Sequence, residues 1–400
     1  MNILKKLSRD KPYIFFLSSA LLFTLITSVL IGTIFWEAYP VVSKTGVINY
    51  VFKDTWRYSD RDFTVFTFPE IAGDKKQQKN LLDHVNAIDA GAGRLIKGSK
   101  YLPEGDQVRI IKDGATIARL VVAGDVCYLK NRDLRIEIGE AKLKDGRIEV
   151  RRGGIYGIWT FIMGTFIMTA VTMCMAIPLS MFTAIYLAEF ANQRLRSVMR
   201  SSIELLVGIP SVVYGLFGFL ILRGYLRDYV NPLISNTLGV FIPFFRDTGS
   251  DGFGILLASV ILTVMIIPTI ISVAEDSLRS VSNEYKRGSY ALGATQWETI
   301  YKLVIPVAMP GVLTGIILGV TRALGETMAI AMLIGGGSRI PGSIFDSSTA
   351  MTAKLLTDIG YHMSYPEHVS ALMGIAAALF VMEAMFIALT RVVGGRMRYV

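Results

Sequence analysis

Long apolar runs constrain this chain more than any other feature of its sequence. The run Tyr13–Phe35 carries no charged side chain, and it is long enough for a helix to cross the roughly 30 Å hydrocarbon core of a bilayer. Further predominantly apolar runs lie at Trp159–Leu187, at Ile203–Leu222, at Phe253–Val273, from about Pro306 onward, and at Val369–Val392. We therefore predict an all-α polytopic membrane protein with six transmembrane helices.

The polar residues are gathered between the first and second of these runs. The chain is 52% hydrophobic and 18% charged, too apolar for a soluble protein and too charged for one made only of membrane spans. About half of all charged residues lie within Val41–Gly153. The pattern predicts a folded domain outside the membrane at residues 41–155, between a first helix in residues 1–40 and a membrane core in residues 156–400.

The second half of this domain alternates apolar and polar residues as β-strands do. The stretches QVRIIKDGATIARLVV and LRIEIGEAKLKDGRIEVRR place Asp113-Gly114 and Asp145-Gly146 between alternating runs, which is a strong hairpin pattern. A short helix is predicted at Lys79–Ile88. We expect a β-rich domain inserted between the first two membrane helices.

Cysteine and histidine residues give no pattern of a disulfide framework or a metal site. Cys127 and Cys174 fall in unlike segments, one polar and one apolar, so we expect no disulfide between them. His84, His362 and His368 lack the spacing of metal ligands, and the last two fall in a polar stretch where solvated side chains are expected. We expect neither a metal nor a catalytic set.

Two ionisable residues, Arg322 and Glu326, interrupt the apolar run that begins near Pro306. An ionisable side chain at the centre of a membrane helix costs about 2.5 to 3.5 kcal/mol on insertion scales, so each needs a partner, a watery cavity or a function. Four residues apart on one helix, they are expected to share a face and are able to pair, which would lower the cost of both. The pair either serves only to stabilise a helix bundle or lines a route for an anion, whose oxygens match the donors of the guanidinium.

The surrounding residues resemble a known family. TRALGETMA, together with the preceding SYALGATQWETIYKLVIP, is similar to the membrane subunits of the phosphate-specific ABC importer, the Pst system, and more to its PstC type. The family's cytoplasmic loop pattern contains a glycine, and Gly293 matches it. The pattern ends in Ile-x-Leu-Pro, where Leu303 and Ile305 occupy the two aliphatic positions and Pro306 occupies the proline position. The family's Glu-Ala-Ala triplet is absent, because Arg287–Ser289 occupies those positions.

The resemblance implies the type I ABC importer permease fold and an importer of inorganic phosphate. In that family the charged residues of the fifth helix are tied to phosphate passage, which assigns Arg322 and Glu326 to the substrate pathway. Thr321 and Thr327 flank them and offer hydroxyl groups, although helix packing is the favoured role for both.

The loop at residues 276–303 contains a short helix, predicted at about Asn283–Gly293. Such a helix either docks into a groove of another protein or lies on lipid headgroups. The resemblance implies that this loop couples the permease to an ATPase, and the residues we assign to that contact are Tyr290, Ala291, Leu292 and Gly293.

The chain contains no nucleotide-binding loop, so we expect a transport subunit rather than an enzyme. No cofactor is expected in this chain, and ATP would bind to a partner. The resemblance implies as partners a second related permease, a dimer of ATPase subunits, an external phosphate-binding protein, inorganic phosphate and membrane lipid. No nucleic acid is expected.

Basic residues predict the orientation of the chain. If the amino end is cytoplasmic, the inner loops hold most of the basic residues, in agreement with the positive-inside rule. These are Arg194, Arg196, Arg200, Arg279, Lys286, Arg287 and Lys302. We predict a multi-pass protein of the cell inner membrane with both termini in the cytoplasm and the inserted domain outside.

Two other functions stay open. One is a permease of the same family for another oxyanion, such as sulfate, molybdate or a phosphonate. The other is a membrane-anchored sensor whose external domain binds a ligand while the spans relay the event. For the inserted domain we hypothesise a contact with the binding protein or with neighbours in the envelope, although a solvated face is the favoured reading of its basic excess.

Overall fold

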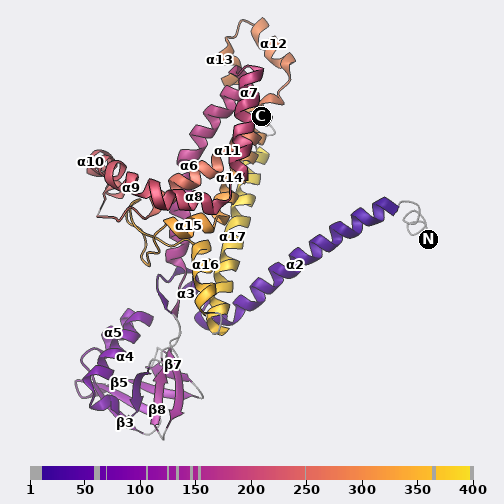
Figure 1. Ribbon diagram of the computed structural model, residues 1–400. Coiled ribbons are helices and arrows are strands. Elements are labelled where there is room, and N and C mark those ends of the chain that lie inside the picture. Colours follow the sequence, from indigo (N-terminus) through magenta and orange to yellow (C-terminus); the bar gives the residue numbers. More distant parts are fainter. Residues whose placement is uncertain are drawn as a thin grey trace. The chain divides into compact units, whose positions relative to one another are not determined.

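The structure is a computed structural model that describes residues 11–57, 64–68, 70–104, 107–123, 126–131, 135–144, 147–151, 155–247, 249–362 and 366–396. The chain divides into two compact units (Figure 1). The transmembrane unit falls within residues 1–42, 159–363 and 369–400. The inserted unit falls within residues 43–158 and 364–368.

The transmembrane unit is built of helices. They are α2 (Lys11–Thr45), α6 (Trp159–Ile185), α7 (Gln193–Gly208), α8 (Ser211–Phe217), α9 (Arg223–Tyr225), α10 (Asn231–Phe241), α11 (Ile255–Arg279), α12 (Asn283–Ala291), α13 (Gln296–Thr299), α14 (Ile305–Gly325), α15 (Met328–Leu333), α16 (Met351–His362) and α17 (Pro366–Arg396). Short π-helical turns extend or join several of them, at Tyr186–Phe190, Gly218–Leu222, Leu226–Val230 and Ile300–Val304. Within the described residues, five helices can cross a membrane by length and hydropathy, or six spans if one bent pair counts as a span. The predicted polytopic helical fold is confirmed.

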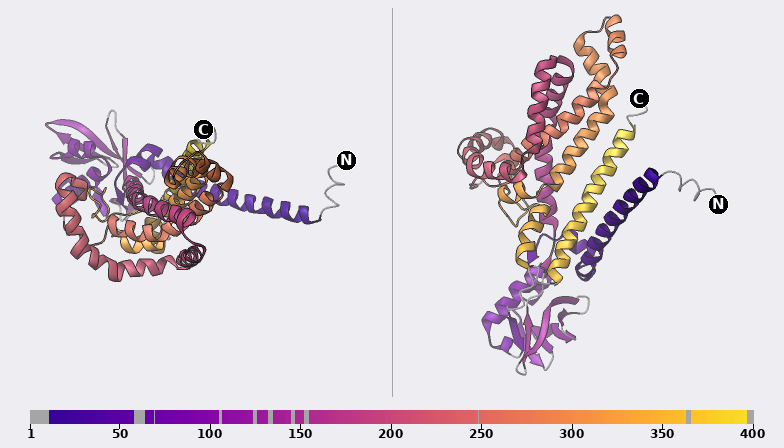
Figure 2. Two further views of the ribbon diagram at one scale, coloured as in Figure 1. Left: turned by 90° about the horizontal axis from the view of Figure 1, so that it is seen from above. Right: turned by 45° about the vertical axis from the view of Figure 1, so that its right-hand side comes forward.

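Helix α11 packs against both α6 and α14, and Figure 2 shows these long helices running along one another. The face of α14 toward α11 carries a glycine every four residues, at Gly311, Gly315 and Gly319. A Cβ at Gly319 would lie 2.8 Å from the side chain of Ile270, so only hydrogen fits there. Small residues at this spacing let two membrane helices approach closely. The contact fixes the rotation of α14 and brings Arg322, one turn after Gly319, to the α11 side.

The third predicted span is not a single helix. Helix α7 ends at Gly208, and the helical segment Ser211–Phe241 departs at an angle of 91°. Pro210 explains the break, because a proline disfavours the helical conformation of the residue before it and has no N–H for the helix ladder. The span predicted over Ile203–Leu222 is therefore bent sharply at this proline.

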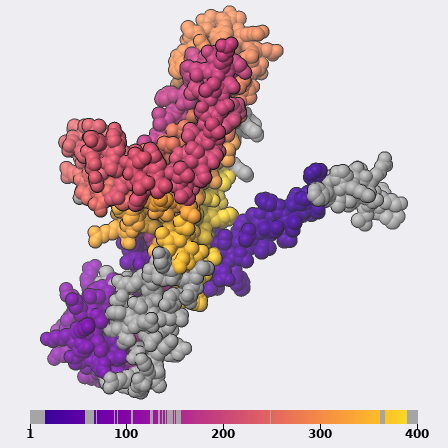
Figure 3. Space-filling view, viewed as in Figure 1, coloured from indigo at the N-terminus to yellow at the C-terminus, as the bar shows by residue number. Residues whose placement is uncertain are grey.

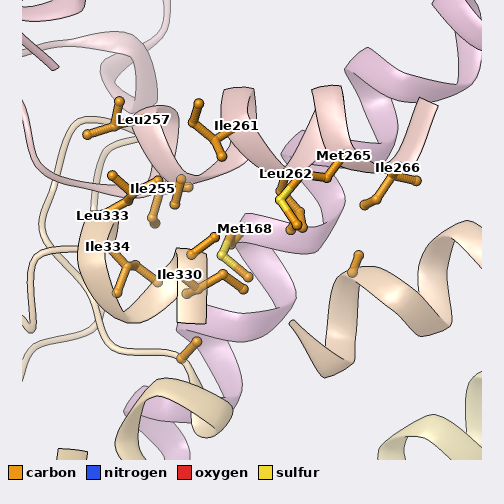
Figure 4. Close-up of a cluster of buried hydrophobic side chains, with 14 of the residues drawn as sticks. Met168, Ile255, Leu257, Ile261, Leu262, Met265, Ile266, Ile330, Leu333 and Ile334 are labelled. Atoms are coloured by element: carbon orange, nitrogen blue, oxygen red, sulfur yellow. The ribbon is translucent and has the colours of Figure 1, made fainter. Parts of the chain in front are cut away.

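The fifth predicted span is also interrupted. Helix α14 ends at Gly325, and the short helix α15 follows it. Figure 4 shows Ile330 and Leu333 of α15 among the buried side chains of Met168 from α6 and Ile261 from α11. Helix α15 is thus held in the apolar core of the unit, where its side chains pack with those of α6 and α11.

The inserted unit is a seven-stranded antiparallel sheet with helices against one face. The strand order is β2-β8-β7-β6-β5-β4-β3. The strands are β2 (Thr64–Phe68), β3 (Lys100–Glu104), β4 (Gln107–Lys112), β5 (Ala115–Ala123), β6 (Val126–Lys130), β7 (Arg135–Lys144) and β8 (Arg147–Arg151). Helices α4 (Lys75–Ile88) and α5 (Ala90–Ile96) pack on the sheet, and α3 (Val47–Phe52) precedes it. The predicted β-rich insertion is confirmed.

A two-stranded ribbon lies where the chain enters and leaves the inserted unit. Strand β1 (Trp56–Arg57) pairs with β9 (Ile155–Tyr156), and Trp56 lies directly opposite Tyr156. The ribbon therefore holds the two ends of the insertion side by side.

The first predicted hairpin is present between β4 and β5. Asp113 and Gly114 have φ angles of 52° and 81°, the pair of left-handed residues that a two-residue type I′ turn needs. Asp145 and Gly146 lie outside the described residues, although β7 and β8 on either side of them pair with each other. Helix α4 contains the predicted helix Lys79–Ile88.

Cys127 is buried and Cys174 is exposed, and both are free thiols. His368 was expected to be solvated, but its side chain is only 1% exposed. The imidazole lies 5.7 Å from the ring of Trp56, so an aromatic cluster of the inserted unit encloses it. The side chain of His362 lies outside the described residues.

Candidate functional site

Arg322 lies in the last turn of α14. At about 1.5 Å per residue it is roughly 25 Å along the axis from Ile305, within a hydrocarbon core about 30 Å thick. Glu326 is not part of this helix, because its backbone is extended with ψ of 130°. The structure describes both residues and shows no ion pair between them. The predicted pair on one helix face is therefore wrong: the helix stops at Gly325, a poor helix former, and the chain turns toward α15.

The guanidinium of Arg322 faces α11. Its Nη1 donates a hydrogen bond to the hydroxyl of Thr269 on α11, at 2.9 Å. A guanidinium has five N–H donors, and this is its one hydrogen bond among the described residues. The other donors are of the kind that bind oxyanions.

The residues after Arg322 form a break in the helix. The carbonyl of Glu326 accepts a hydrogen bond from the hydroxyl of Thr352 on α16, at 2.8 Å. The hydroxyl of Thr327 donates to the carbonyl of Gly325, at 3.2 Å, and that of Thr321 donates to the carbonyl four residues earlier. The donor protons of both predicted threonines are thus engaged with backbone groups.

Glu383 of α17 also lies beside this break, and sequence analysis missed it. A Cβ at Gly325 would lie 3.7 Å from the Oε1 of Glu383. Within the part of the chain that the structure describes, Glu383 has neither an ion pair nor a hydrogen bond through its side chain. Its charge could have revealed it, because Glu383 is the only charged residue within the apolar run Val369–Thr390. One guanidinium and two carboxyl groups therefore gather at the end of α14.

The predicted coupling residues lie where α12 ends, at one tip of the transmembrane unit (Figure 3). The N–H of Ala294 donates to the carbonyl of Ser289, and that of Gly293 donates to the carbonyl of Tyr290, which is a Schellman motif. Gly293 has φ of 84°, a conformation that residues with a Cβ rarely adopt. The glycine of the family pattern is required here by the backbone.

Apolar side chains are exposed around this motif. The side chain of Leu292 is 91% exposed and that of Tyr290 is 44% exposed, and Ala291 is exposed as well. Trp297 and Tyr301, which follow in the chain, are also exposed. Exposed apolar groups gathered in this way are typical of an interaction site.

Helix α12 is anchored to the transmembrane unit by polar contacts that sequence analysis did not foresee. The Nζ of Lys286 lies 2.6 Å from the Oε1 of Glu189, which follows α6, and the side chains are only 14% and 7% exposed. The hydroxyl groups of Ser289 and Thr299 lie 2.9 Å apart. We call the Lys286–Glu189 contact the α12 anchor.

Comparison with known proteins connects both regions to one family. Residues 176–399 match the family described as the binding-protein-dependent transport system inner membrane component. The chain belongs to this family. The matched residues include the α14 break and the α12 loop, whereas residues 43–158 of the inserted unit lie before them. As a member of this family, the protein is a multi-pass membrane component of a transport system.

Several relatives carry names that describe their transport role. The chain is 36% identical over 243 residues to the probable ABC transporter permease protein YqgH of Bacillus subtilis, covering 60% of this chain and 72% of that protein. It is 36% identical over 208 residues to the phosphate transport system permease protein PstC of Xylella fastidiosa strain Temecula1, covering 51% and 64%. It is 33% identical over 245 residues to PstC of Haemophilus influenzae, covering 61% and 77%.

Solved structures of ABC transporters are also similar. An inward-facing MetNI methionine transporter matches with 17% identity and a TM-score of 0.42, covering 60% of this chain and 97% of that chain. A bacterial alginate transporter in complex with its pentasaccharide-bound periplasmic protein matches with 14% identity and a TM-score of 0.42, covering 60% and 79%.

Proposed function

We propose that this family member is the PstC-type permease subunit of an ATP-driven importer of inorganic phosphate, with Arg322 as the anion-binding group of its pathway. The observation that carries the proposal is a guanidinium deep within the spans that has no ion pair among the described residues. A charge at that depth is costly unless it is compensated, and a passing oxyanion compensates it. The relatives named as phosphate transport permeases support phosphate as that anion.

The broken helix supports the pathway role. In membrane transporters, interrupted helices occur where the backbone lines a cavity, and solute sites are often built at such interruptions. Glu326 and Glu383 place carboxyl groups beside the same break. Their negative charge weakens the hold of Arg322 on an anion, and conduction requires binding that is weak enough to release the ion.

The remaining partners follow from the coupling loop and the orientation. The exposed end of α12 docks into a groove of an ATPase subunit, as amphipathic helices do, through Tyr290, Ala291, Leu292 and Gly293. ATP binds to that subunit and not to this chain, which needs no cofactor of its own. A second permease completes the pathway and an external binding protein delivers the phosphate. The termini lie in the cytoplasm and the inserted unit lies outside.

The test is reconstitution of the protein in lipid vesicles with its ATPase, its second permease and its external binding protein. We expect phosphate to stimulate ATP hydrolysis and labelled phosphate to accumulate in the vesicles, whereas sulfate and molybdate have no effect. Stimulation by sulfate or molybdate alone would assign a different oxyanion. ATP hydrolysis without uptake of any of these anions would indicate a sensor.

A further inference from the structure

The open face of the sheet in the inserted unit carries four cations in a line across four neighbouring strands. Arg109 of β4 lies directly opposite Arg119 of β5, Arg119 lies opposite Lys130 of β6, and Lys130 lies opposite Arg135 of β7. Because neighbouring strands are about 4.8 Å apart, the line is roughly 14 Å long. We call these four residues the basic row.

The alternation of the strands shows which face the basic row occupies. Val108 and Ile110 on either side of Arg109 are fully buried, as are Leu120 beside Arg119 and Leu129 beside Lys130. These buried side chains pack with those of α4 and α5. Since successive residues of a strand point to opposite faces, the basic row points away from the helices.

The basic row is an unfavourable arrangement for the sheet itself. Like charges directly opposite each other on neighbouring strands destabilise the pairing, and the row contains three such pairs in succession. Among the residues that the structure describes, compensating contacts are found at the two ends of the row. Arg109 forms an ion pair with Glu104, and the guanidinium of Arg135 lies 4.3 Å above the ring of Tyr128.

The centre of the row is uncompensated. Arg119 and Lys130 are exposed and have no ion pair with any residue that the structure describes. A face that is only solvated gains nothing from aligned like charges, because alternating signs would stabilise it. The alignment is therefore better explained by something outside the unit that binds it.

We propose that the basic row docks onto the acidic face of another protein. A sheet holds its side chains in a flat array of fixed spacing, which suits another rigid surface, and the planar donors of arginine match carboxylates in two-point contacts. The half-buried side chains of Val121 and Tyr128 lie opposite each other in the next register position of this face. Arginine and tyrosine are enriched in the cores of protein interfaces. If the partner is the external binding protein of the importer, this identification rests on the proposed function. The inference that the partner's surface is acidic does not depend on that function.

The first experiment measures binding to the full-length protein in nanodiscs of neutral lipid, with poly-L-glutamate as the acidic probe. The row variant is Arg119→Glu/Lys130→Glu. The matched control is Lys76→Glu/Lys79→Glu, which makes the same change of charge on α4, away from the open face. We expect the row variant to bind at least about tenfold more weakly than the unchanged protein, and the control to bind within about twofold of it.

Other outcomes of this experiment overturn the proposal. Equal losses in the row variant and the control would show a response to net charge only. Binding that depends on the row for vesicles of phosphatidylglycerol but not for poly-L-glutamate would assign the face to lipid, and displacement of the probe by millimolar phosphate would assign it to the free anion. Because no transport is measured, these results are independent of whether the protein imports phosphate.

The second experiment measures the stability of the inserted unit within the full chain. In a Cys174→Ala background, the buried thiol of Cys127 reacts with a maleimide only when this unit opens, so labelling during heating reports its Tm. The row variant turns two of the three like-charge pairs, those with Arg109 and Arg135, into opposite-charge pairs and leaves one like-charge pair between the two substituted positions. We therefore expect its Tm to be a few degrees higher than that of the control. A lower Tm would show that the row stabilises the sheet, and would overturn the proposal.

Discussion

In the proposed pathway, anion passage depends directly on the single residue Arg322. Among the described residues its side chain makes one hydrogen bond, to Thr269, so replacing it by glutamine removes its charge and at most that one described hydrogen bond. We expect Arg322→Gln to lower phosphate uptake by a factor on the order of 30 or more, because the anion loses its charged partner in a desolvated site. Uptake of labelled phosphate and recovery of the intact complex measure the two effects separately.

The control for this prediction is another arginine that has a different role. Arg200 on α7 pairs with Asp276 at 3.0 Å, and both side chains are exposed. Exposed ion pairs contribute little to stability, so Arg200→Gln should leave uptake nearly unchanged. Normal uptake kinetics for Arg322→Gln would contradict the pathway role.

Cys127 allows a prediction about pH. Burial raises the pKa of its thiol from about 9 to about 12, so the folded unit disfavours the thiolate. A group whose pKa is raised on folding contributes stability that is complete below its unfolded pKa and is lost as the pH rises through the folded pKa. We therefore expect the Tm of the inserted unit to fall between pH 9 and pH 12.

The same thiol should resist alkylation at pH 8 while the unit is folded, because the thiolate is the reactive form. Mass spectrometry after maleimide treatment measures this, with urea-unfolded protein as the positive control. A Cys127→Ala variant should lose less stability between pH 9 and pH 12 than the unchanged protein. Rapid labelling of folded Cys127 at pH 8 would show that the thiol is not buried as described.

At the scale of elements, the attachment of α12 to the transmembrane unit gives a prediction. The α12 anchor joins it to the end of α6 through a largely buried ion pair. Removing one partner of a buried pair typically costs ~3 to 5 kcal/mol, because the other charge is left without compensation. We expect Lys286→Glu and Glu189→Lys each to lower the phosphate transported per ATP hydrolysed, and the double exchange to restore it.

An exposed pair nearby provides the comparison. Lys302 and Glu298 lie 3.4 Å apart with side chains that are 70% and 46% exposed. Exchanging these two charges should change the amount of phosphate transported per ATP hydrolysed only a little. If the double exchange of Lys286 and Glu189 fails to recover transport while each single variant assembles normally, the anchor does not carry the coupling.

At the scale of the whole molecule, the ribbon of β1 and β9 makes the inserted unit separable. Because Arg57 lies opposite Ile155, a two-residue Asn-Gly turn can join them in place of residues 58–154. We expect the shortened protein to insert and assemble with its partners, since the helices of the transmembrane unit have their own core. Recovery of the complex from membranes measures this.

Phosphate uptake by the shortened protein also tests whether the basic row is needed for transport. If the basic row serves docking, the shortened protein and the Arg119→Glu/Lys130→Glu variant should show similar losses of uptake. Full uptake by the shortened protein would mean that the inserted unit has no essential part in transport.

Features that depend on neighbouring residues could be predicted from the sequence. The membrane spans follow from runs of apolar residues, because a bilayer requires about 20 of them in a helix. The hairpin at Asp113-Gly114 follows from two residues that tolerate positive φ, and the glycine at position 293 follows from a helix end that needs the same conformation. These are local requirements, so a short stretch of chain carries all the information.

The sequence by itself therefore determined the helical membrane class, the β-rich insertion, and the presence of an intramembrane Arg322. Only the tertiary structure decided that α14 stops before Glu326, that Arg322 contacts Thr269, and that Glu383 joins them from a distant helix. The reason is physical: α15 leaves the line of α14 because its apolar side chains are buried by α6 and α11, and the basic row exists only in the register of four strands. Such contacts depend on residues far apart in the chain, which no local pattern specifies.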